Sequence, residues 1–165
     1  MTQAPELEGE DGWGSLDGFR SNRRSFVRTD LDDDRLRVRY FRREADGALV
    51  GKIWFGPGTQ GPPGHAHGGS MASVLDDAMG ISAWLAGHMV VAAEIRIRFL
   101  NMLPLGTVAW IEACAPEVDG KKVKTVGKLH APDGTVYATG EGLFIHLGPE
   151  RFSEFAERAR RQQDG

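Results

Sequence analysis

The feature that most constrains the fold is a single long helix pattern, at residues 69–86, in a chain whose other patterned segments alternate as β-strands do. The loop GPGTQGPPG precedes this helix, and Gly87 follows it as a favourable residue for ending a helix. Met71, Val74 and Leu75 begin an apolar stripe at the spacing of a helix face that packs on a core. A lone helix buries such a stripe against a sheet, so the sequence predicts an α+β fold with one central helix.

Strand-like alternation occurs on both sides of the predicted helix. Residues 36–41 and 48–55 flank Asp46-Gly47, which is a strong hairpin signal. The later strand segments are separated by the turn signals Asp119-Gly120 and Pro132-Asp133-Gly134; they are residues 90–100, 106–118, 121–131 and 135–147. We therefore expect five or six antiparallel strands, with one face on the helix and the other face and edges available for oligomerisation.

The length of 165 residues suits one domain with tails. We expect a flexible, acidic, glycine-rich arm at residues 1–25, containing a short helix near residues 13–19. The α+β domain is expected at residues 26–148. Residues 149–165 are expected to form a short amphipathic helix and tail, because Pro149 suits the first turn of a helix and Phe152 and Phe155 begin an apolar stripe.

Composition excludes several classes of partner. A formal net charge of −3 gives no general attraction to nucleic acid or to an anionic membrane. No apolar run approaches the roughly 20 residues that span a bilayer, and the acidic start MTQAPELEGEDGWG lacks the order of a signal peptide. Cys114 is the only cysteine, so no internal disulfide forms and a cytoplasmic location is expected. Its small and apolar neighbours predict a buried strand thiol.

Two adjacent acids stand on the predicted helix. Neighbours on a helix point apart, so Asp76 and Asp77 cannot act together as a carboxylate pair. The surroundings of Asp76 on the helix are small or apolar, which predicts partial desolvation, a raised pKa and a role as general base. Asp77 fits a solvated helix residue better.

The start of the helix supplies a complementary feature. Gly68 and Gly69 allow a tight turn that presents free backbone N–H groups, which together with the helix dipole can hold an oxyanion. The segment GGSMA superficially matches a serine nucleophile elbow, but that motif needs a preceding strand in a parallel sheet. His65 and His67 with Asp76 match no standard metal spacing, so no metal site is predicted.

Several motifs in order resemble the hotdog-fold acyl-CoA thioesterases of the 4-hydroxybenzoyl-CoA thioesterase superfamily. They are GPPGHAHGGSMASVLDDAMG, RFLNMLPLG, VDGKKVKTVGKL and YATGEGLFIHL, within residues 35–148. The resemblance is closest to the subgroup with the phenylacetate-pathway thioesterase and human thioesterase-superfamily members. It implies acyl-CoA hydrolysis without a cofactor, with Asp76 as the catalytic carboxylate (general base or nucleophile), the Gly68 amide as oxyanion donor and His67 supporting the loop. It also implies a homodimer or a dimer of dimers, with each site formed between two subunits.

The chain departs from this family pattern at two places. Many relatives carry an Asn where this chain has Gly61, and a Ser or Thr where it has Ala92 or Ala93. The resemblance places His65, Gly69, Ala92 and Ala93 near the substrate. Cations are expected to bind the phosphates of coenzyme A, and the candidates are Lys121, Lys122, Lys124, Lys128, Arg96 and Arg98. Two other functions stay open: a non-catalytic acyl-CoA binding or sensing module, and an enoyl-thioester hydratase or dehydratase.

Overall fold

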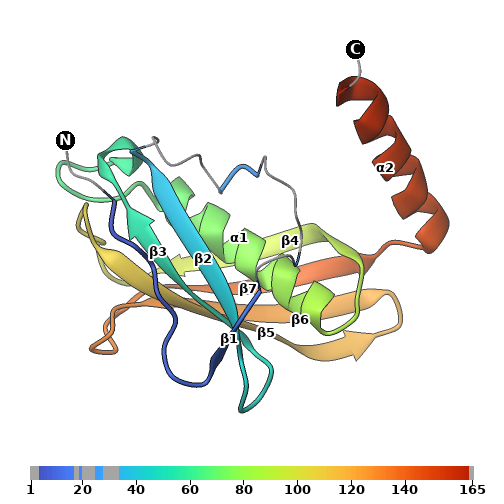
Figure 1. Ribbon diagram of the computed structural model, residues 1–165, viewed down its shortest axis with the longest axis horizontal. Coiled ribbons are helices and arrows are strands. Elements are labelled where there is room, and N and C mark those ends of the chain that lie inside the picture. The colour runs from blue at the N-terminus through green and yellow to red at the C-terminus, as the bar shows by residue number, and fades with distance from the viewer. Residues whose placement is uncertain (1–3, 17–18, 20–24, 28–33, 164–165) are drawn as a thin grey trace.

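The computed structural model describes residues 4–16, 19, 25–27 and 34–163. Within these residues one antiparallel sheet of seven strands, in the order β1-β2-β3-β5-β6-β7-β4, curves around the single long helix α1 (Gly68–Leu85), as Figure 1 shows. The strands are β1 (Trp13–Ser15), β2 (Leu36–Arg43), β3 (Leu49–Phe55), β4 (Val90–Phe99), β5 (Val108–Asp119), β6 (Lys122–His130) and β7 (Val136–His146). The predicted α+β architecture with one central helix is confirmed.

The three predicted hairpin turns are confirmed. Gly47, Gly120 and Gly134 have φ angles of 74°, 56° and 92°, a region that glycine enters without steric cost. They close the β2–β3, β5–β6 and β6–β7 hairpins, whose strands pair antiparallel. The register is unbroken in β2–β3 and shifts once in each of the other two pairs.

The sheet has one more strand than expected, because part of the N-terminal segment joins it. The short helix expected near residues 13–19 is wrong in the described part: Trp13–Ser15 form β1, paired with β2. The Trp13 ring packs against Phe41 and Trp110, with centroids 5.6 and 5.3 Å away, so an aromatic cluster places this strand on the sheet edge. Leu7 is also buried. Much of the rest of the expected arm, including residues 17–18 and 20–24, lies outside the described residues.

Helix α1 ends where the sequence predicted. Gly87 has a φ of 92°, its N–H donates to the Trp84 carbonyl, and the His88 N–H donates to the Ala83 carbonyl. These two bonds satisfy carbonyls that a helix C-terminus otherwise leaves without partners. The stripe that begins at Met71 is buried against the sheet, so the core lies between α1 and the concave face.

Strand β4 forms one edge of the sheet and pairs only with β7 among the described strands. Most of its residues are exposed, including the apolar side chains of Val91, Ile95 and Phe99. A register shift between Ala92 and Glu94 marks a bulge.

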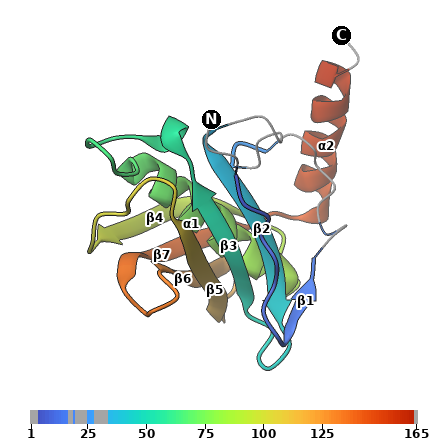
Figure 2. The same ribbon diagram turned by 60° about the vertical axis from the view of Figure 1, so that its left-hand side comes forward.

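The predicted C-terminal helix is confirmed as α2 (Pro149–Gln163). It stands apart from the sheet in both ribbon views (Figures 1 and 2). The Phe152 ring packs edge-on against Trp84, with centroids 5.3 Å apart. Neither this helix nor any other in the described ranges has the length and apolar character needed to cross a membrane.

Candidate functional site

The N-terminus of α1 is organised by His67. This residue is the N-cap, with an extended backbone at φ −66° and ψ 137°, and its Nδ1 accepts the Gly69 N–H at 2.8 Å. An accepting Nδ1 carries no proton, so a neutral His67 ring is protonated at Nε2. The Ser70 N–H donates to the His67 carbonyl at 3.0 Å. Among the described residues nothing accepts the Gly68 N–H, so this amide remains open for a ligand.

The loop before α1 is fixed from two sides. The His67 N–H donates to the Thr59 carbonyl at 2.7 Å, and the Ala66 N–H donates to the Leu103 carbonyl at 2.8 Å. Nδ1 of His65 lies 2.9 Å from the Pro63 carbonyl oxygen, so this ring contacts its own loop.

Gly61 is explained by the same loop. A Cβ at this position would lie 2.8 Å from Cα of His67, closer than real side chains approach a backbone. An Asn at residue 61 would therefore displace His67. The departure from the family pattern at Gly61 is a consequence of how closely this loop passes the helix start.

Phe99 lies beside the open amide, a contact that the sequence did not predict. A Cβ added to Gly68 would lie 3.2 Å from the Phe99 ring, so the end of β4 covers one side of the helix start. The ring is still 52% exposed. An aromatic ring next to an open amide gives this corner both an apolar wall and a hydrogen-bond donor.

Asp76 is half-buried on α1, and its pKa is shifted upward, as expected for a general base. Burial raises the pKa of Asp76 above its ordinary value of 3.8, and the neighbouring charge of Asp77 raises it further. Among the described residues no side chain donates a hydrogen bond to Asp76 or forms an ion pair with it. Its carboxylate therefore lacks the groups that would lower its basicity.

Asp77 is not the freely solvated residue expected from the sequence. Its Oδ2 accepts the Tyr40 hydroxyl at 2.9 Å, a bond from β2 to α1. Tyr40 is buried, so this contact positions the helix against the sheet. The two adjacent acids thus have separate surroundings, as their helical geometry requires.

Gly68 and Asp76 cannot act on one carbonyl within a single chain. They are eight residues apart on α1, or roughly 12 Å along the axis at about 1.5 Å per residue. An oxyanion donor and a general base must each lie about 3 Å from the reacting group. A site using both groups needs a second copy of the chain.

The expected coenzyme A contacts fall in two places. Arg98 is exposed at the same end of β4 as Phe99, but consecutive strand residues point to opposite faces, so its side chain does not share the face on which Phe99 meets Gly68. Lys121, Lys122 and Lys124 are exposed around the β5–β6 turn, where Lys122 is opposite Ile145 and Ile145 is opposite Val91. This is the far end of β4, so one chain does not bring these lysines to Gly68. Lys124 also pairs with Glu117 at 3.0 Å.

The remaining candidates have the following places. Ala92 and Ala93 are exposed at the β4 bulge. The Ser70 hydroxyl, from the serine of the GGSMA segment, donates to the His67 carbonyl at 2.6 Å.

Cys114 is exposed, which contradicts the predicted buried thiol. The reason is that the β3–β5 pairing reaches only Ala113, so Cys114 lies past the start of β3.

A single long helix wrapped by an antiparallel sheet is a hotdog-like fold. Similarity to known proteins shows that this chain belongs to the thioesterase superfamily. The family model described as "Thioesterase superfamily" matches residues 63–138. Human acyl-coenzyme A thioesterase THEM5 is 30% identical over 86% of this chain and 67% of its own length. Acyl-coenzyme A thioesterase THEM4 of Xenopus laevis is 32% identical over 77% of this chain and 58% of its own.

Solved structures agree with this assignment. A crystal structure of a thioesterase superfamily protein has a TM-score of 0.63 and 32% identity, covering 66% of this chain and 53% of that one. The BH2602 protein of Bacillus halodurans, solved with CoA, has a TM-score of 0.58 and 28% identity, covering 66% of this chain and 73% of that one. The expected resemblance to hotdog-fold thioesterases is confirmed.

Proposed function

We propose that this protein hydrolyses an acyl-CoA thioester to a free acid and coenzyme A. The observation that carries the proposal is the pairing, on one helix, of an open N-terminal amide with a half-buried carboxylate whose pKa is raised. The names of the relatives THEM5 and THEM4, and the CoA in the related BH2602 structure, support acyl-CoA as the substrate.

In the proposed reaction Asp76 accepts a proton from water as that water attacks the thioester carbonyl. The Gly68 N–H donates to the oxyanion of the tetrahedral intermediate. Collapse of the intermediate breaks the C–S bond, and the proton held by Asp76 goes to the departing thiolate. Direct attack by the Asp76 carboxylate on the carbonyl, followed by hydrolysis of the anhydride, uses the same two groups. His67 acts as a positioning residue, because its Nδ1 engages the Gly69 amide and leaves the Gly68 amide free.

The site is proposed to form between two copies of the chain. The roughly 12 Å between Gly68 and Asp76 along α1 excludes a site within one copy. The exposed β4 edge supplies both unpaired backbone groups and apolar side chains for association. A homodimer, or a dimer of dimers, would place Asp76 of one chain against Gly68 of the other.

Substrate contacts are assigned around this shared site. Arg98 is the cation nearest the helix start along β4, and Gly69, His65, Ala92 and Ala93 are proposed to contact the thioester, the two alanines from the other end of β4. Lys121, Lys122 and Lys124 are proposed to attract the phosphates from the other end of β4.

The test is release of the coenzyme A thiol, followed with a thiol-reactive dye over acetyl, medium-chain, long-chain and aryl acyl-CoA substrates. Asp76→Asn is expected to abolish turnover without unfolding the chain. Turnover at the wild-type rate in this variant would overturn the role of Asp76.

A matched pair of variants tests the Gly68 amide. Proline is tolerated at the first position of a helix, and the extended His67 backbone suits a residue before proline. Gly68→Pro therefore removes the N–H, while Gly68→Ala adds a similar Cβ near Phe99 and keeps the N–H. Loss of the donor is expected to lower kcat by about 100- to 1,000-fold in Gly68→Pro relative to Gly68→Ala. Equal rates would contradict an oxyanion role for this amide.

The same assay separates the two other functions. A hydratase would add water to an enoyl-CoA without releasing thiol. A binding module would bind acyl-CoA tightly and turn over none of the panel. The alanines at residues 92–93, in place of the hydroxyl of many relatives, are the observation that favours the binding module.

A further inference from the structure

A cavity separate from the proposed catalytic site lies at the other end of α1. Its volume is about 510 Å³, within the range of small-molecule sites. It lies between the β2–β3 turn, the last turn of α1 and the neighbouring parts of β5 and β6. Ser82, on its wall, is six residues beyond Asp76, which is roughly 9 Å along the helix and about 120° around it. A ligand in this cavity would therefore not contact Asp76 of the same chain.

One side of the cavity is apolar. Its apolar lining comprises Leu85 of α1, the C-cap residue Ala86, and Leu49, Ala113 and Ala115 of the sheet. Leu49 and Ala113 are buried core residues, so the cavity reaches the edge of the core. This wall suits the hydrocarbon body of a ligand.

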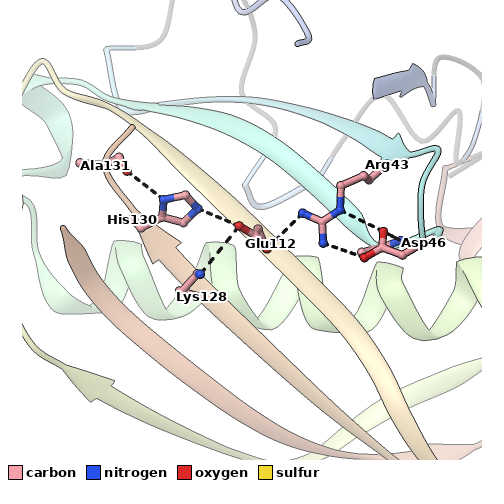
Figure 3. A network of polar contacts seen from close by, with 7 residues as sticks. Arg43, Asp46, Glu112, Lys128, His130 and Ala131 are labelled. Carbon is pink, nitrogen blue, oxygen red and sulfur yellow. Dashed lines mark hydrogen bonds and ion pairs between the residues drawn. The ribbon is translucent and has the colours of Figure 1, made fainter. Parts of the chain in front are cut away.

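The acids of the cavity are already neutralised. Glu112 accepts from Arg43 at 3.2 Å and lies 3.1 Å from Nε2 of His130 and 3.8 Å from the Lys128 ammonium. Arg43 also holds Asp46 at 2.8 Å, and this pair lowers the pKa of Asp46 to about 2. Figure 3 shows these groups as one continuous chain of contacts. A cationic ligand would find no free carboxylate here.

Arg42 contributes a charge that this network does not neutralise. It is exposed on the cavity rim, and among the described residues it has no hydrogen-bond or ion-pair partner. Its guanidinium lies over the turn, where a Cβ at Gly47 would be 3.1 Å from Nη2. The rim therefore presents a positioned cation beside an apolar wall.

We infer that this cavity binds a small organic carboxylate with an apolar body, its carboxylate on the Arg42 guanidinium and its body against Leu85 and Ala86. The site goes beyond the proposed function, because it uses neither Asp76 nor Gly68. A ligand with a carboxylate head and an apolar body matches both the Arg42 guanidinium and the apolar wall. An amine or a neutral alcohol of the same length matches only the apolar wall.

Cys114 provides a direct readout, because it is the only cysteine of the chain, is exposed and lines this cavity. The rate of its alkylation by iodoacetamide would be measured against rising concentrations of octanoate, octylamine and octanol. Octanoate is expected to slow alkylation in a saturable way, and the amine and the alcohol to have at least about tenfold weaker effects. The same result is expected in Asp76→Asn, which separates this site from the proposed catalytic one.

Two variants test the assignment to the cavity. Arg42→Gln is expected to weaken octanoate protection about tenfold, the equivalent of one charge-assisted contact. Arg151→Gln, a matched loss of charge on the exposed helix α2, is expected to leave protection unchanged. Ala86→Trp is expected to fill the cavity and abolish protection in a chain that still melts cooperatively. Protection that is absent in the wild type, or unaltered by both Arg42→Gln and Ala86→Trp, would overturn the inference.

Discussion

At the scale of single residues, the proposed mechanism turns on the ionisation of Asp76. Burial and the charge of Asp77 raise the pKa of Asp76 above 3.8, and only the ionised carboxylate can accept a proton. The value of kcat/KM is therefore expected to fall as pH drops through this raised pKa, with the midpoint of the acid limb above 3.8. Measuring CoA release from pH 4 to 8 checks this. An acid limb centred below 3.8 would contradict the assignment of Asp76 as the base.

Stability gives an independent control for the same group. A carboxyl whose pKa is raised on folding binds its proton more tightly in the native state, so the native state loses stability as pH rises through that pKa. The free energy of unfolding of the wild type, relative to Asp76→Asn, should therefore decline between acid and neutral pH. The two variants would show parallel pH profiles if Asp76 were fully solvated.

The sequence could propose this site because the relation between its two groups depends on local geometry. The helical spacing of Gly68 and Asp76 follows from residues that are adjacent in the chain. The partner of Asp77 could not be found in that way, because Tyr40 is 37 residues away and is brought close only by sheet curvature. The burial of Cys114 was wrong for a related reason: it depends on where the neighbouring strand begins, and sequence patterns fix such boundaries poorly.

At the scale of elements, Gly51 links two strands to the helix. A Cβ on Gly51 would lie 2.7 Å from the Arg39 carbonyl oxygen and 2.8 Å from the Tyr40 ring. The absent side chain lets Tyr40 lie across β3 and reach Asp77 on α1. Gly51→Ala is expected to lower the free energy of unfolding by about 1–3 kcal/mol through overpacking. Chemical denaturation checks this value.

A double-mutant cycle shows whether that cost passes through Tyr40. Tyr40→Phe removes only the hydroxyl, at a cost of about 1 kcal/mol in the otherwise native chain. In the Gly51→Ala background the displaced ring no longer reaches Asp77, so the same change should cost close to nothing. Full additivity would show that Gly51 does not position the Tyr40 ring.

The Glu112 network on β5 and β6 makes a second element-scale prediction. Burial alone would raise the pKa of Glu112, but Lys128, Arg43 and His130 outweigh it and lower the pKa below 4.5. A lowered pKa contributes stability that is present above 4.5 and is lost as pH falls through the folded value. Glu112→Gln is therefore expected to cost about 1 kcal/mol at pH 7, after allowance for its partial exposure, and progressively less in acid.

A matched acid provides the control for Glu112. Glu141 is 71% exposed and lies 3.8 Å from Arg96, which is also exposed, so this pair is strongly screened. Glu141→Gln is expected to leave the melting temperature nearly unchanged across the same pH range. An equal effect of the two substitutions would mean that the Glu112 contacts add no stability beyond surface charge.

The elements themselves were largely predictable. Turn chemistry at Asp46-Gly47, Asp119-Gly120 and Pro132-Asp133-Gly134 identified three hairpins, and helical periodicity identified α1 and α2. Strand β1 was missed because it is three residues long and depends on the packing of Trp13 against Phe41 and Trp110. An aromatic cluster between distant segments leaves no periodic signal in the sequence.

At the scale of the whole molecule, the length of α1 separates the two proposed sites. The open amide lies at its start, the proposed base at its middle, and the cavity proposed to bind a carboxylate at its end. A rigid helix cannot bring the first two together, so the proposed chemistry requires association. The exposed β4 edge, with Val91, Ile95 and Phe99, is the surface that such an assembly is proposed to use.

Mixing two inactive variants tests the shared site. A chain with Asp76→Asn keeps the Gly68 amide, and a chain with Gly68→Pro keeps Asp76. If each site takes one group from each subunit, a mixed dimer contains one intact site, and random exchange should restore about a quarter of the wild-type activity. The measurement is CoA release before and after the two variants are unfolded together and refolded. Each variant refolded alone should stay inactive.

The β4 edge supplies the control for this mixture. Adding Ile95→Glu to both chains places a charge in the proposed interface, so sedimentation should show monomers and the mixture should regain no activity. Recovery that persists in monomers would contradict the shared site. Absence of recovery in a mixture that does form mixed dimers would show instead that Asp76 and Gly68 do not meet across the interface, because each chain of a mixed dimer carries only one of the two groups.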